Sequence, residues 1–386
     1  MQLPNKLNKK LNQRKINNAL RNLGKENSFV DFSSNDYLGF AKSEMIFDKT
    51  HRFLVDNNHK VNGATGSRLL SGNHKLYTIV EKQLAKLHNS ETALVFNSGY
   101  DANIGFFASI PQRGDIILYD ELIHASIRDG IQLSNAKSFK FKHNDTKDLE
   151  EKILRFTQNN DSEIYVVTES VFSMDGDSPD LTAMSQIIKK YTNVHFVVDE
   201  AHALGVFDFG LIQKLHLEDV VFARIITFGK GLGCHGAAIL GSKQLQQYLI
   251  NFSRSFIYTT GLPPHALATI KIAYDELIIS DSKAQLQQNI QHFISESNRL
   301  RLNFIQSTSA IHCCIISGNE HVKNMALQLQ QHGFEVKPIL SPTVPTNQER
   351  LRFCLHAYNS KEEITNVLEN LATFVLKIQC KIIIPF

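Results

Sequence analysis

Short apolar runs, each about as long as one strand, recur along the middle of the chain and are separated by helix-length stretches. A helix-like pattern of apolar positions, from about His74 to His88, precedes the first run. Strands that alternate with helices in this way predict a parallel α/β sheet. The apolar runs lie near Ala93–Phe96, Ile116–Tyr119, Ile164–Thr168, Phe196–Asp199 and Ile225–Phe228.

Polar residues follow several of these predicted strands directly. In a parallel sheet, ligands bind at the carboxyl ends of the strands. Ser98, Glu169, Asp199 and Thr227 all fall at such ends. The pattern therefore predicts that these side chains converge on one site.

The two ends of the chain have different patterns. Basic residues with apolar residues at helical spacing indicate amphipathic helices before about residue 30, solvated and packed on the protein. Contact with a membrane or a phosphate is the alternative. After a Gly-Leu-Pro-Pro break at residues 261–264, helical patterns lead to short strands near Ile311–Ile316 and Leu351–Leu355. We therefore predict an N-terminal helical segment (residues 1–45), a large α/β domain (residues 46–270) and a smaller C-terminal α+β domain (residues 271–386).

Composition narrows the classes of function. The 386 residues are 42% hydrophobic, which allows a large core and more than one domain. The formal charge of +3 does not favour a nucleic-acid partner. The absence of a long apolar stretch and of a signal pattern predicts no membrane span and a cytoplasmic location. The five cysteines lack the CxxC spacing of zinc and redox sites, so we expect a reducing compartment and no metal.

Lys230 and Asp199 carry the clearest chemical signal. Lys230 stands between two glycines directly after an apolar run, and Asp199 ends the preceding run. An acid and an amine at neighbouring strand ends suit a pyridine-based cofactor, because the acid keeps the ring nitrogen protonated while the amine bonds to an aldehyde. We therefore expect the cofactor to be pyridoxal 5'-phosphate (PLP). A surface lysine and a helix-capping aspartate are the plainer alternatives.

Two histidines complete the predicted site. His202 follows Asp199 closely, and we expect it to bond to a ring oxygen. His124 follows another predicted strand, and we expect its imidazole to stack on the ring. Together with Lys230, these residues provide a partner for the face, the nitrogen, the oxygen and the aldehyde of one flat heterocycle. A hydrogen-bonded core histidine is the alternative for His202.

The phosphate of the cofactor needs hydrogen-bond donors. Residues 97–103 predict a strand-to-helix turn, whose free N–H groups and dipole favour an anion. A purely structural turn is the alternative. The predicted phosphate contacts are Ser98, Gly99, Tyr100, Thr227, Thr259 and Thr260.

Several segments together resemble the α-oxoamine synthases, PLP-dependent transferases of fold type I, the aspartate-aminotransferase type. Residues 341–345 ahead of 350–352 look most like the member of this family that serves biotin biosynthesis. The resemblance implies a large domain with a mainly parallel central sheet and a smaller C-terminal domain. The other matching segments are Phe32–Gly39, Gly66–Arg68 with Ser71–Gly72, Ser98–Tyr100, His124–Ser126, Val171–Asp177, Asp199–His202 and Thr227–Lys230.

The resemblance implies a decarboxylating condensation of L-alanine with a pimeloyl thioester of coenzyme A or of a carrier protein, which gives 8-amino-7-oxononanoate. It implies a homodimer with shared active sites, in which Thr260 reaches the partner's phosphate. The further residues that it assigns are Ser173 for the ring oxygen, Arg352 for the carboxylate of alanine, and Asn35 and Arg21 for the substrate side.

Sister enzymes of the family are the closest alternatives, namely glycine C-acetyltransferase, serine palmitoyltransferase and 5-aminolevulinate synthase, because they share the cofactor residues. Asp199 to His202 also spell the DEAH box of nucleic-acid-dependent ATPases, but no GxxxxGK[ST] loop precedes them. A serine hydrolase is not favoured either, because Phe96 stands where the GxSxG motif around Ser98 requires glycine.

Overall fold

The computed structural model describes residues 3–24, 26–157 and 162–383, and the chain forms two compact units. The large unit comprises Asn35–Ser173 and Ser178–Ala284, and the small unit comprises Met1–Ser34, Met174–Asp177 and Gln285–Phe386. These bounds differ from the predicted limits at residues 45 and 270. The N-terminal residues belong to the small unit because β1 (Val30–Asp31) pairs with β10 (Phe334–Glu335), and residue 270 lies inside the continuous helix α11 (Pro264–Ile279).

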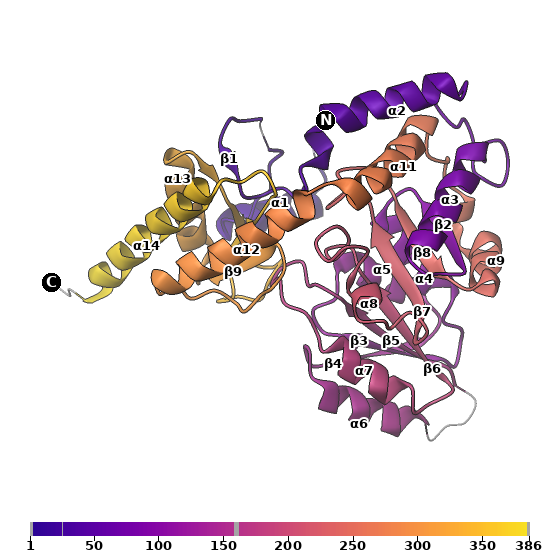
Figure 1. The fold of residues 1–386 in the computed structure, drawn as a ribbon. Helices are drawn as coiled ribbons and strands as arrows, with labels where there is room; N and C mark the ends of the chain where they lie inside the picture. Colours follow the sequence, from indigo (N-terminus) through magenta and orange to yellow (C-terminus); the bar gives the residue numbers. More distant parts are fainter. Residues whose placement is uncertain (1–2, 25, 158–161, 384–386) are drawn as a thin grey trace. The chain divides into compact units, whose positions relative to one another are not determined.

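A seven-stranded sheet forms the centre of the large unit, in the order β2-β8-β7-β6-β5-β3-β4 (Figure 1). Among the strands of this sheet in the described residues, β8 alone runs opposite to the other six, so the predicted mainly parallel sheet of the type I fold is confirmed. The strands are β2 (Thr92–Phe96), β3 (Ile116–Asp120), β4 (Lys137–Phe141), β5 (Ile164–Glu169), β6 (Val194–Asp199), β7 (Val221–Thr227) and β8 (Ala237–Gly241).

Two of these strands, β4 and β8, were not predicted. The edge strand β4 is mostly exposed, so its sequence lacks an apolar run. The strand β8 follows the Lys230 turn closely and returns antiparallel between β7 and β2, which breaks the alternation of strands with helices.

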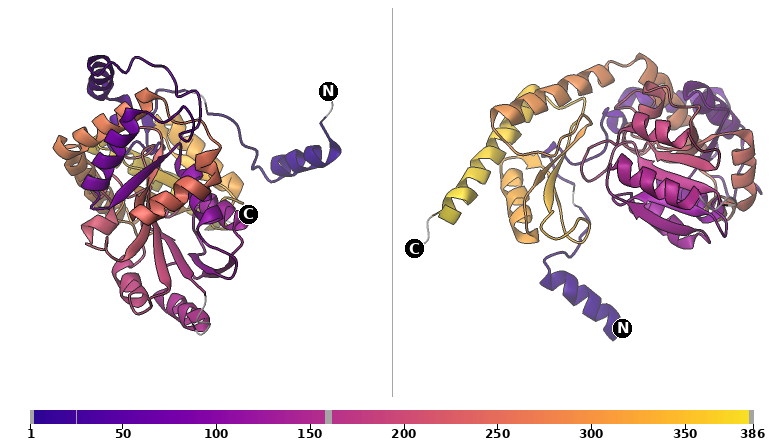
Figure 2. Two further views of the ribbon diagram at one scale, coloured as in Figure 1. Left: turned by 90° about the vertical axis from the view of Figure 1, so that its right-hand side faces the viewer. Right: turned by 90° about the horizontal axis from the view of Figure 1, so that it is seen from below.

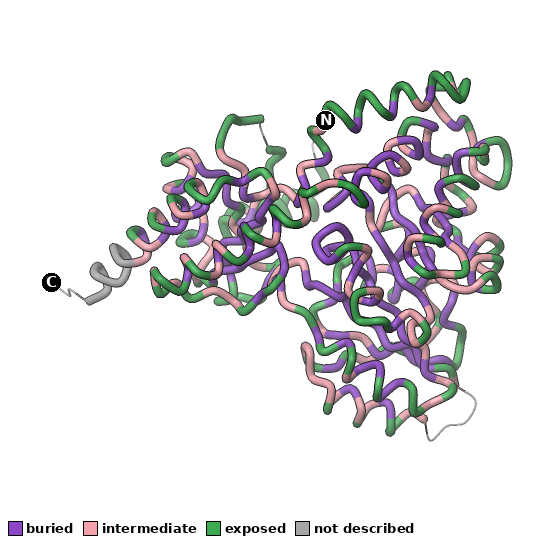
Figure 3. The backbone as a smooth tube through the Cα atoms, in the orientation of Figure 1, coloured by how far each residue is buried: buried purple, intermediate pink, exposed green. Residues whose placement is uncertain are grey.

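Helices cover both faces of the sheet (Figure 2). Successive residues of a strand point to opposite faces, and in β6 Val197 belongs to the core under α4, α5, α9 and α10, whereas Phe196 and Val198 belong to the core under α6, α7 and α8. The burial of the central strands is visible in Figure 3. The helices are η1 (Phe40–Lys42), α2 (Glu44–Asp56), α3 (Lys75–Leu87), α4 (Gly99–Ser109), α5 (Ala125–Leu133), α6 (Thr146–Thr157), α7 (Leu181–Ile188), α8 (Leu211–Lys214), α9 (Lys243–Phe252), α10 (Arg254–Ile257) and α11.

The small unit is built on a three-stranded antiparallel sheet of order β11-β12-β9. Its strands β9 (Ile311–Ile315) and β12 (Arg350–Cys354) lie where the sequence predicts them. Its remaining elements are β11 (Lys337–Ile339), α12 (Ser282–Arg299, from Gln285 on), α13 (Asn319–Gln331) and α14 (Lys361–Ile383).

The N-terminal helix α1 (Asn5–Ile16) has no buried residue, and all of its residues except Arg14 are exposed. The exposure agrees with the expected solvated helix, and the carbonyl oxygen of Asn17, directly after α1, accepts a hydrogen bond from Asn319 of α13 at 3.0 Å. Leu7 and Leu11 are 47% and 45% exposed, because the cationic side chains around them leave too narrow an apolar stripe to bury. None of the helices in the described part of the chain is long and apolar enough to cross a bilayer.

Candidate active site

Lys230 lies on the turn that follows β7, at the carboxyl end of that strand. The turn passes close to the segment that follows Asp199. A Cβ atom at Gly231 would lie only 2.4 Å from the carbonyl oxygen of Leu204, so glycine permits this approach. As a result, Nζ of Lys230 is 2.7 Å from Nε2 of His202.

His202 is buried and connects Lys230 to two further polar residues. Its Nδ1 is 2.7 Å from Oη of Tyr37, which is 0% exposed. The Tyr37 hydroxyl donates to Oδ1 of Asn35 at 3.2 Å. These four side chains therefore form a continuous row of hydrogen bonds. The role of Tyr37 was not predicted, because a lone tyrosine in a turn carries no chemical signal in the sequence.

Asp199 ends β6 and is 5% exposed. Both of its carboxylate oxygens accept hydrogen bonds: Oδ2 from Nδ2 of Asn103 at 2.8 Å, and Oδ1 from the backbone N–H of Ala201 at 2.9 Å. In the parallel pair of β6 and β7, Asp199 lies opposite Ile225, shortly before Lys230. The topology thus brings the acid and the amine to the same edge of the sheet.

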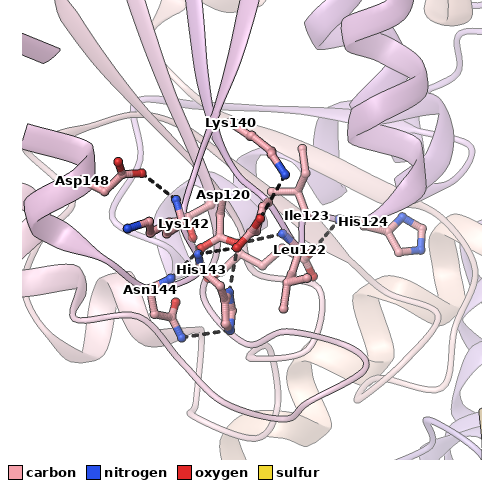
Figure 4. A network of polar contacts seen from close by, with 12 residues as sticks. Asp120, Leu122, Ile123, His124, Lys140, Lys142, His143, Asn144 and Asp148 are labelled. Atoms are coloured by element: carbon pink, nitrogen blue, oxygen red, sulfur yellow. Dashed lines mark hydrogen bonds and ion pairs between the residues drawn. The ribbon is translucent and has the colours of Figure 1, made fainter. Parts of the chain in front are cut away.

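His124 is the N-cap of α5, and its Nδ1 accepts the backbone N–H of Ser126 at 3.2 Å. The turn before it is fixed by Asp120, which is fully buried at the end of β3 (Figure 4). The carboxylate of Asp120 accepts the backbone N–H groups of Leu122 at 2.8 Å and of Asn144 at 2.9 Å. A buried acid therefore fixes the backbone that presents the imidazole.

The charge state of His124 depends on its surroundings. Burial within the cluster and the ammonium group of Lys230 lower the pKa of His124, while the negative charge of Asp199 opposes them. The residue still keeps an exposed surface. A neutral imidazole at the solvent side of the cluster is therefore favoured at neutral pH.

Glu169 is a further acid in the cluster. It ends β5, lies opposite Asp199 in the pairing with β6, and accepts the backbone N–H of His124 at 2.5 Å. Burial, together with the negative charge of Asp199, raises the pKa of Glu169 well above its ordinary value. The sequence placed Glu169 at a strand end but gave it no role. The structure shows that it anchors the backbone of His124.

The predicted phosphate turn lies at the start of α4. Ser98 caps this helix, and its Oγ accepts the backbone N–H of Asp101 at 3.1 Å. The other N–H groups of the first helical turn have no acceptor within the helix, so this end favours an anion. A Cβ atom at Gly99 would lie 2.5 Å from Oγ1 of Thr227. The glycine therefore keeps open the space beside the threonine hydroxyl and the helix end.

The remaining predicted phosphate contacts lie around this turn. Nδ2 of Asn97 donates to Oγ1 of Thr259 at 3.0 Å and to the carbonyl oxygen of Thr260 at 2.7 Å. This ties the segment before the Pro-Pro pair to the end of β2. Thr260 and Tyr100 are exposed, and the Tyr100 hydroxyl donates to Asp129 at 2.8 Å.

The predicted substrate residues belong to both units. Ser173 is half-buried on the loop after β5 in the large unit. Arg352 and Arg21 belong to the small unit, where Arg352 is buried in β12 and Arg21 is exposed. Arg350, on the same face of β12, forms an ion pair with Asp175. Its charge is therefore already matched.

Comparison with known proteins identifies the family. The sequence pattern of the family described as aminotransferase class I and II matches residues 27–371. A protein named 8-amino-7-oxononanoate synthase from Emericella nidulans is 40% identical over 382 residues, which cover 91% of this chain and 90% of that protein. The chain belongs to the class I and II aminotransferase family.

Two solved structures have the same fold as this chain. The 8-amino-7-oxononanoate synthase from Francisella tularensis is 27% identical, covers 92% of this chain and 100% of its own, and has a TM-score of 0.77. A serine palmitoyltransferase from S. paucimobilis with bound PLP is 23% identical, covers 97% of this chain and 98% of its own, and shares the fold at a TM-score of 0.87. Both are α-oxoamine synthases, and this family member is an enzyme of that type.

The cluster in the large unit of this aminotransferase-family chain fits PLP. Lys230 offers an amine, Asp199 a buried acid with both oxygens hydrogen-bonded, and His124 a flat ring. Gly99, at the start of α4, leaves beside Thr227 a space that any side chain would fill. The described residues include no group of three or more histidines, cysteines and acids arranged to hold a metal ion.

Proposed function

We propose that this protein is a PLP-dependent acyltransferase that condenses L-alanine with a pimeloyl thioester. The reaction releases the thiol carrier and carbon dioxide and gives 8-amino-7-oxononanoate. Family membership supports the cofactor, and the names of relatives at up to 40% identity support the reaction. The observation that carries the proposal is the placement of Lys230 and Asp199 at adjacent strand ends, beside the N-terminus of α4.

The residues of the large unit then have separate tasks. When bound, PLP supplies an electron-poor ring that takes up the electron pair left on a substrate carbon. Lys230 would hold the aldehyde carbon of the cofactor through Nζ, and its free amine would take the proton from the α-carbon of the amino acid. Asp199 keeps the ring nitrogen protonated, and His124 covers one face of the ring. Thr227 and the first turn of α4 hold the phosphate.

The row of hydrogen bonds from Lys230 to Asn35 has a defined donor and acceptor at each contact when Lys230 is protonated. A protonated Lys230 donates to Nε2 of His202, so the histidine carries its own proton on Nδ1 and donates it to Oη of Tyr37. The Tyr37 hydroxyl in turn donates to Asn35. When Lys230 is neutral, the His202 proton can move to Nε2 and the Tyr37 hydroxyl can turn towards Nδ1. The row therefore accepts both protonation states of the lysine.

Four further residues contact the substrates or the ring oxygen. Arg352 binds the carboxylate of alanine through its guanidinium group, whose fork of N–H donors suits a carboxylate. Ser173 bonds to the ring oxygen, and Asn35 and Arg21 face the substrates. The protein works in the cytoplasm as a homodimer, in which the exposed Thr260 reaches the phosphate of the partner's site.

A substrate panel tests the reaction. The purified protein with PLP is given alanine, glycine or serine together with acetyl, succinyl, pimeloyl or palmitoyl thioesters of coenzyme A and of a carrier protein, and carbon dioxide release is measured. We expect alanine with pimeloyl thioester to be the fastest pair. The serine palmitoyltransferase neighbour makes serine with a palmitoyl thioester the specific competing outcome. A preference for that pair would reassign the enzyme to a sister activity.

A lysine variant tests the site. In Lys230→Ala we expect a folded protein that has lost the visible absorbance and the borohydride-reducible link to PLP, with condensation slowed by about 10²–10⁴-fold. Lys243→Ala is the matched control, because the Lys243 side chain is 72% exposed at the start of α9. A reducible link that survives in Lys230→Ala would show that another amine holds the cofactor.

A further inference from the structure

Asn103 joins two of the proposed cofactor residues. It lies on α4 and is 2% exposed. Its Nδ2 is 2.8 Å from Oδ2 of Asp199 and 3.0 Å from Oγ of Ser126. Oγ of Ser126 lies 2.8 Å from Nδ1 of His124. A single chain of side-chain hydrogen bonds thus runs from the acid to the imidazole.

The donors and acceptors of this chain have only one consistent arrangement. The carboxylate of Asp199 only accepts, so the NH₂ group of Asn103 must face it. The second hydrogen of that NH₂ group points to Oγ of Ser126. Nδ1 of His124 accepts the backbone N–H of Ser126 and so carries no proton, which means that the Ser126 hydroxyl donates its own hydrogen to Nδ1. Because Nδ1 accepts twice, the proton of the neutral imidazole lies on Nε2.

The side-chain oxygen of Asn103 shows which part of the amide group matters at this position. Oδ1 of Asn103 is buried and has no hydrogen-bond partner among the described residues. An unpaired buried oxygen is costly, whereas an apolar side chain of similar size would avoid that cost. The two bonds donated by Nδ2 are therefore what the asparagine contributes here.

We propose that Asn103 is a positioning residue that, through Ser126, fixes the orientation and tautomer of His124 while it holds Asp199 in place. The inference rests on the proposed roles of His124 and Asp199 at the cofactor. It adds a physical connection between them, because one amide group fixes the position of both His124, which covers the ring, and Asp199, which faces the ring nitrogen. The charged groups that act on the His124 imidazole are Lys230, Asp199 and Asp129.

NMR of the full-length protein labelled with ¹⁵N-histidine tests the link directly, with His124→Gln used to assign the signal. In the unaltered protein we expect His124 to be neutral at pH 7, with Nδ1 unprotonated and Nε2 protonated. In Ser126→Ala, loss of the donated hydrogen bond should raise the titration midpoint of His124 by about half a unit to one unit. Ser185→Ala is the control, because it removes a hydroxyl that is equally buried, on α7, and has no hydrogen-bond partner among the described residues.

Asn103→Leu tests the first link of the chain. It should move the His124 midpoint in the same direction by a smaller amount, and the double variant with Ser126→Ala should match Ser126→Ala alone, because both changes act through one hydroxyl. A purely structural role would lower stability and leave the His124 signal unchanged, which would overturn the proposal. A proton found on Nδ1 in the unaltered protein would also overturn it, whatever the variants do.

The cofactor supplies a second reading, which separates this inference from the proposed function. With PLP labelled with ¹⁵N in the ring, Asn103→Leu should shift the ring-nitrogen signal towards the unprotonated form, because Asp199 loses a donor and its fixed position. If the His124 signals behave as expected but no PLP binds, the proposed function fails and the link stands. If PLP binds and Ser126→Ala leaves His124 unchanged, the link fails and the proposed function stands.

Discussion

Asp199 and Glu200 are adjacent in the sequence and both are buried, yet their surroundings differ. Glu200 is 0% exposed and forms a salt bridge with Arg224 of β7, with an O–N distance of 2.7 Å. Its Oε1 also accepts the backbone N–H of Ile212 at 2.9 Å. Asp199 is held by an amide group and a backbone N–H, both of them neutral. One acid is matched by a full positive charge and the other is not.

The difference separates structure from chemistry. The charge of a buried acid with a guanidinium partner is already neutralised, so it does not attract a charged ligand. The Glu200–Arg224 pair joins the end of β6 to β7, the two strands that present Asp199 and Lys230. Gly210 packs directly against the carboxylate of Glu200, since a Cβ atom at this glycine would lie 2.6 Å from the carboxylate oxygens. An acid with neutral donors keeps its charge for a cation, such as the protonated ring nitrogen proposed for Asp199.

The largest effect on stability should come from the paired acid. Glu200→Gln leaves the Arg224 charge buried without its partner, so we expect the free energy of unfolding to fall by about 3–5 kcal/mol. Urea denaturation measures this change. The double variant Glu200→Leu with Arg224→Met removes both charges and should cost less than the single change. Equal losses in the two proteins would show that the ion pair is not the source of the stability.

The isosteric change Asp199→Asn should affect the condensation rate more than the stability. In Asp199→Asn, one hydrogen bond to a carboxylate is lost, and we expect a fall of only about 1–2 kcal/mol in the free energy of unfolding. The condensation rate should nevertheless fall by at least about a hundredfold, because the ring nitrogen loses its anionic partner. Steady-state kinetics of the PLP-loaded protein provide the measurement. A rate close to that of the unaltered enzyme would remove Asp199 from the proposed chemistry.

The comparison of Asp199 with Glu200 also shows which parts of the site could be predicted from the sequence. Asp199 and Lys230 were predictable, because each follows an apolar run and parallel strands end at one edge of a sheet. Nothing in the sequence distinguishes the partner of Asp199 from that of Glu200. Asn103 and Asp199 are 96 residues apart, and Tyr37 and His202 are 165 apart, so only the folded topology brings them together.

The fold was predictable to a similar depth. Central strands gave apolar runs because both of their faces are buried, whereas the exposed edge strand β4 gave none. The predicted domain limits at residues 45 and 270 differ from the limits of the compact units for a related reason. The pairing of β1 with β10 joins segments from opposite ends of the chain, and a two-residue strand leaves no periodic pattern in the sequence.

The smallest expected effect is a change in the free energy of unfolding at low pH, and it arises near Glu200. His88 is 0% exposed, its Nε2 is 2.8 Å from Oη of Tyr274, and its carbonyl oxygen accepts a hydrogen bond from Arg224 at 2.9 Å. Burial and the Arg224 charge hold the pKa of His88 well below its ordinary value of 6.5. The unfolded chain therefore takes up a proton at this residue below pH 6.5, and the folded protein does not.

Stability should accordingly be complete above pH 6.5 and decrease as the pH falls, by at most about 1.4 kcal/mol per pH unit for one such group. His88→Gln keeps a polar atom near Tyr274 but cannot titrate, so its free energy of unfolding should change less between pH 7 and pH 5. His312 of the small unit, whose pKa burial lowers to about 4, adds a decrease of the same sign in both proteins, and it cancels in the comparison. Parallel pH profiles for the two proteins would mean that His88 takes up its proton equally in the folded and the unfolded chain, and that burial beside Arg224 does not lower its pKa.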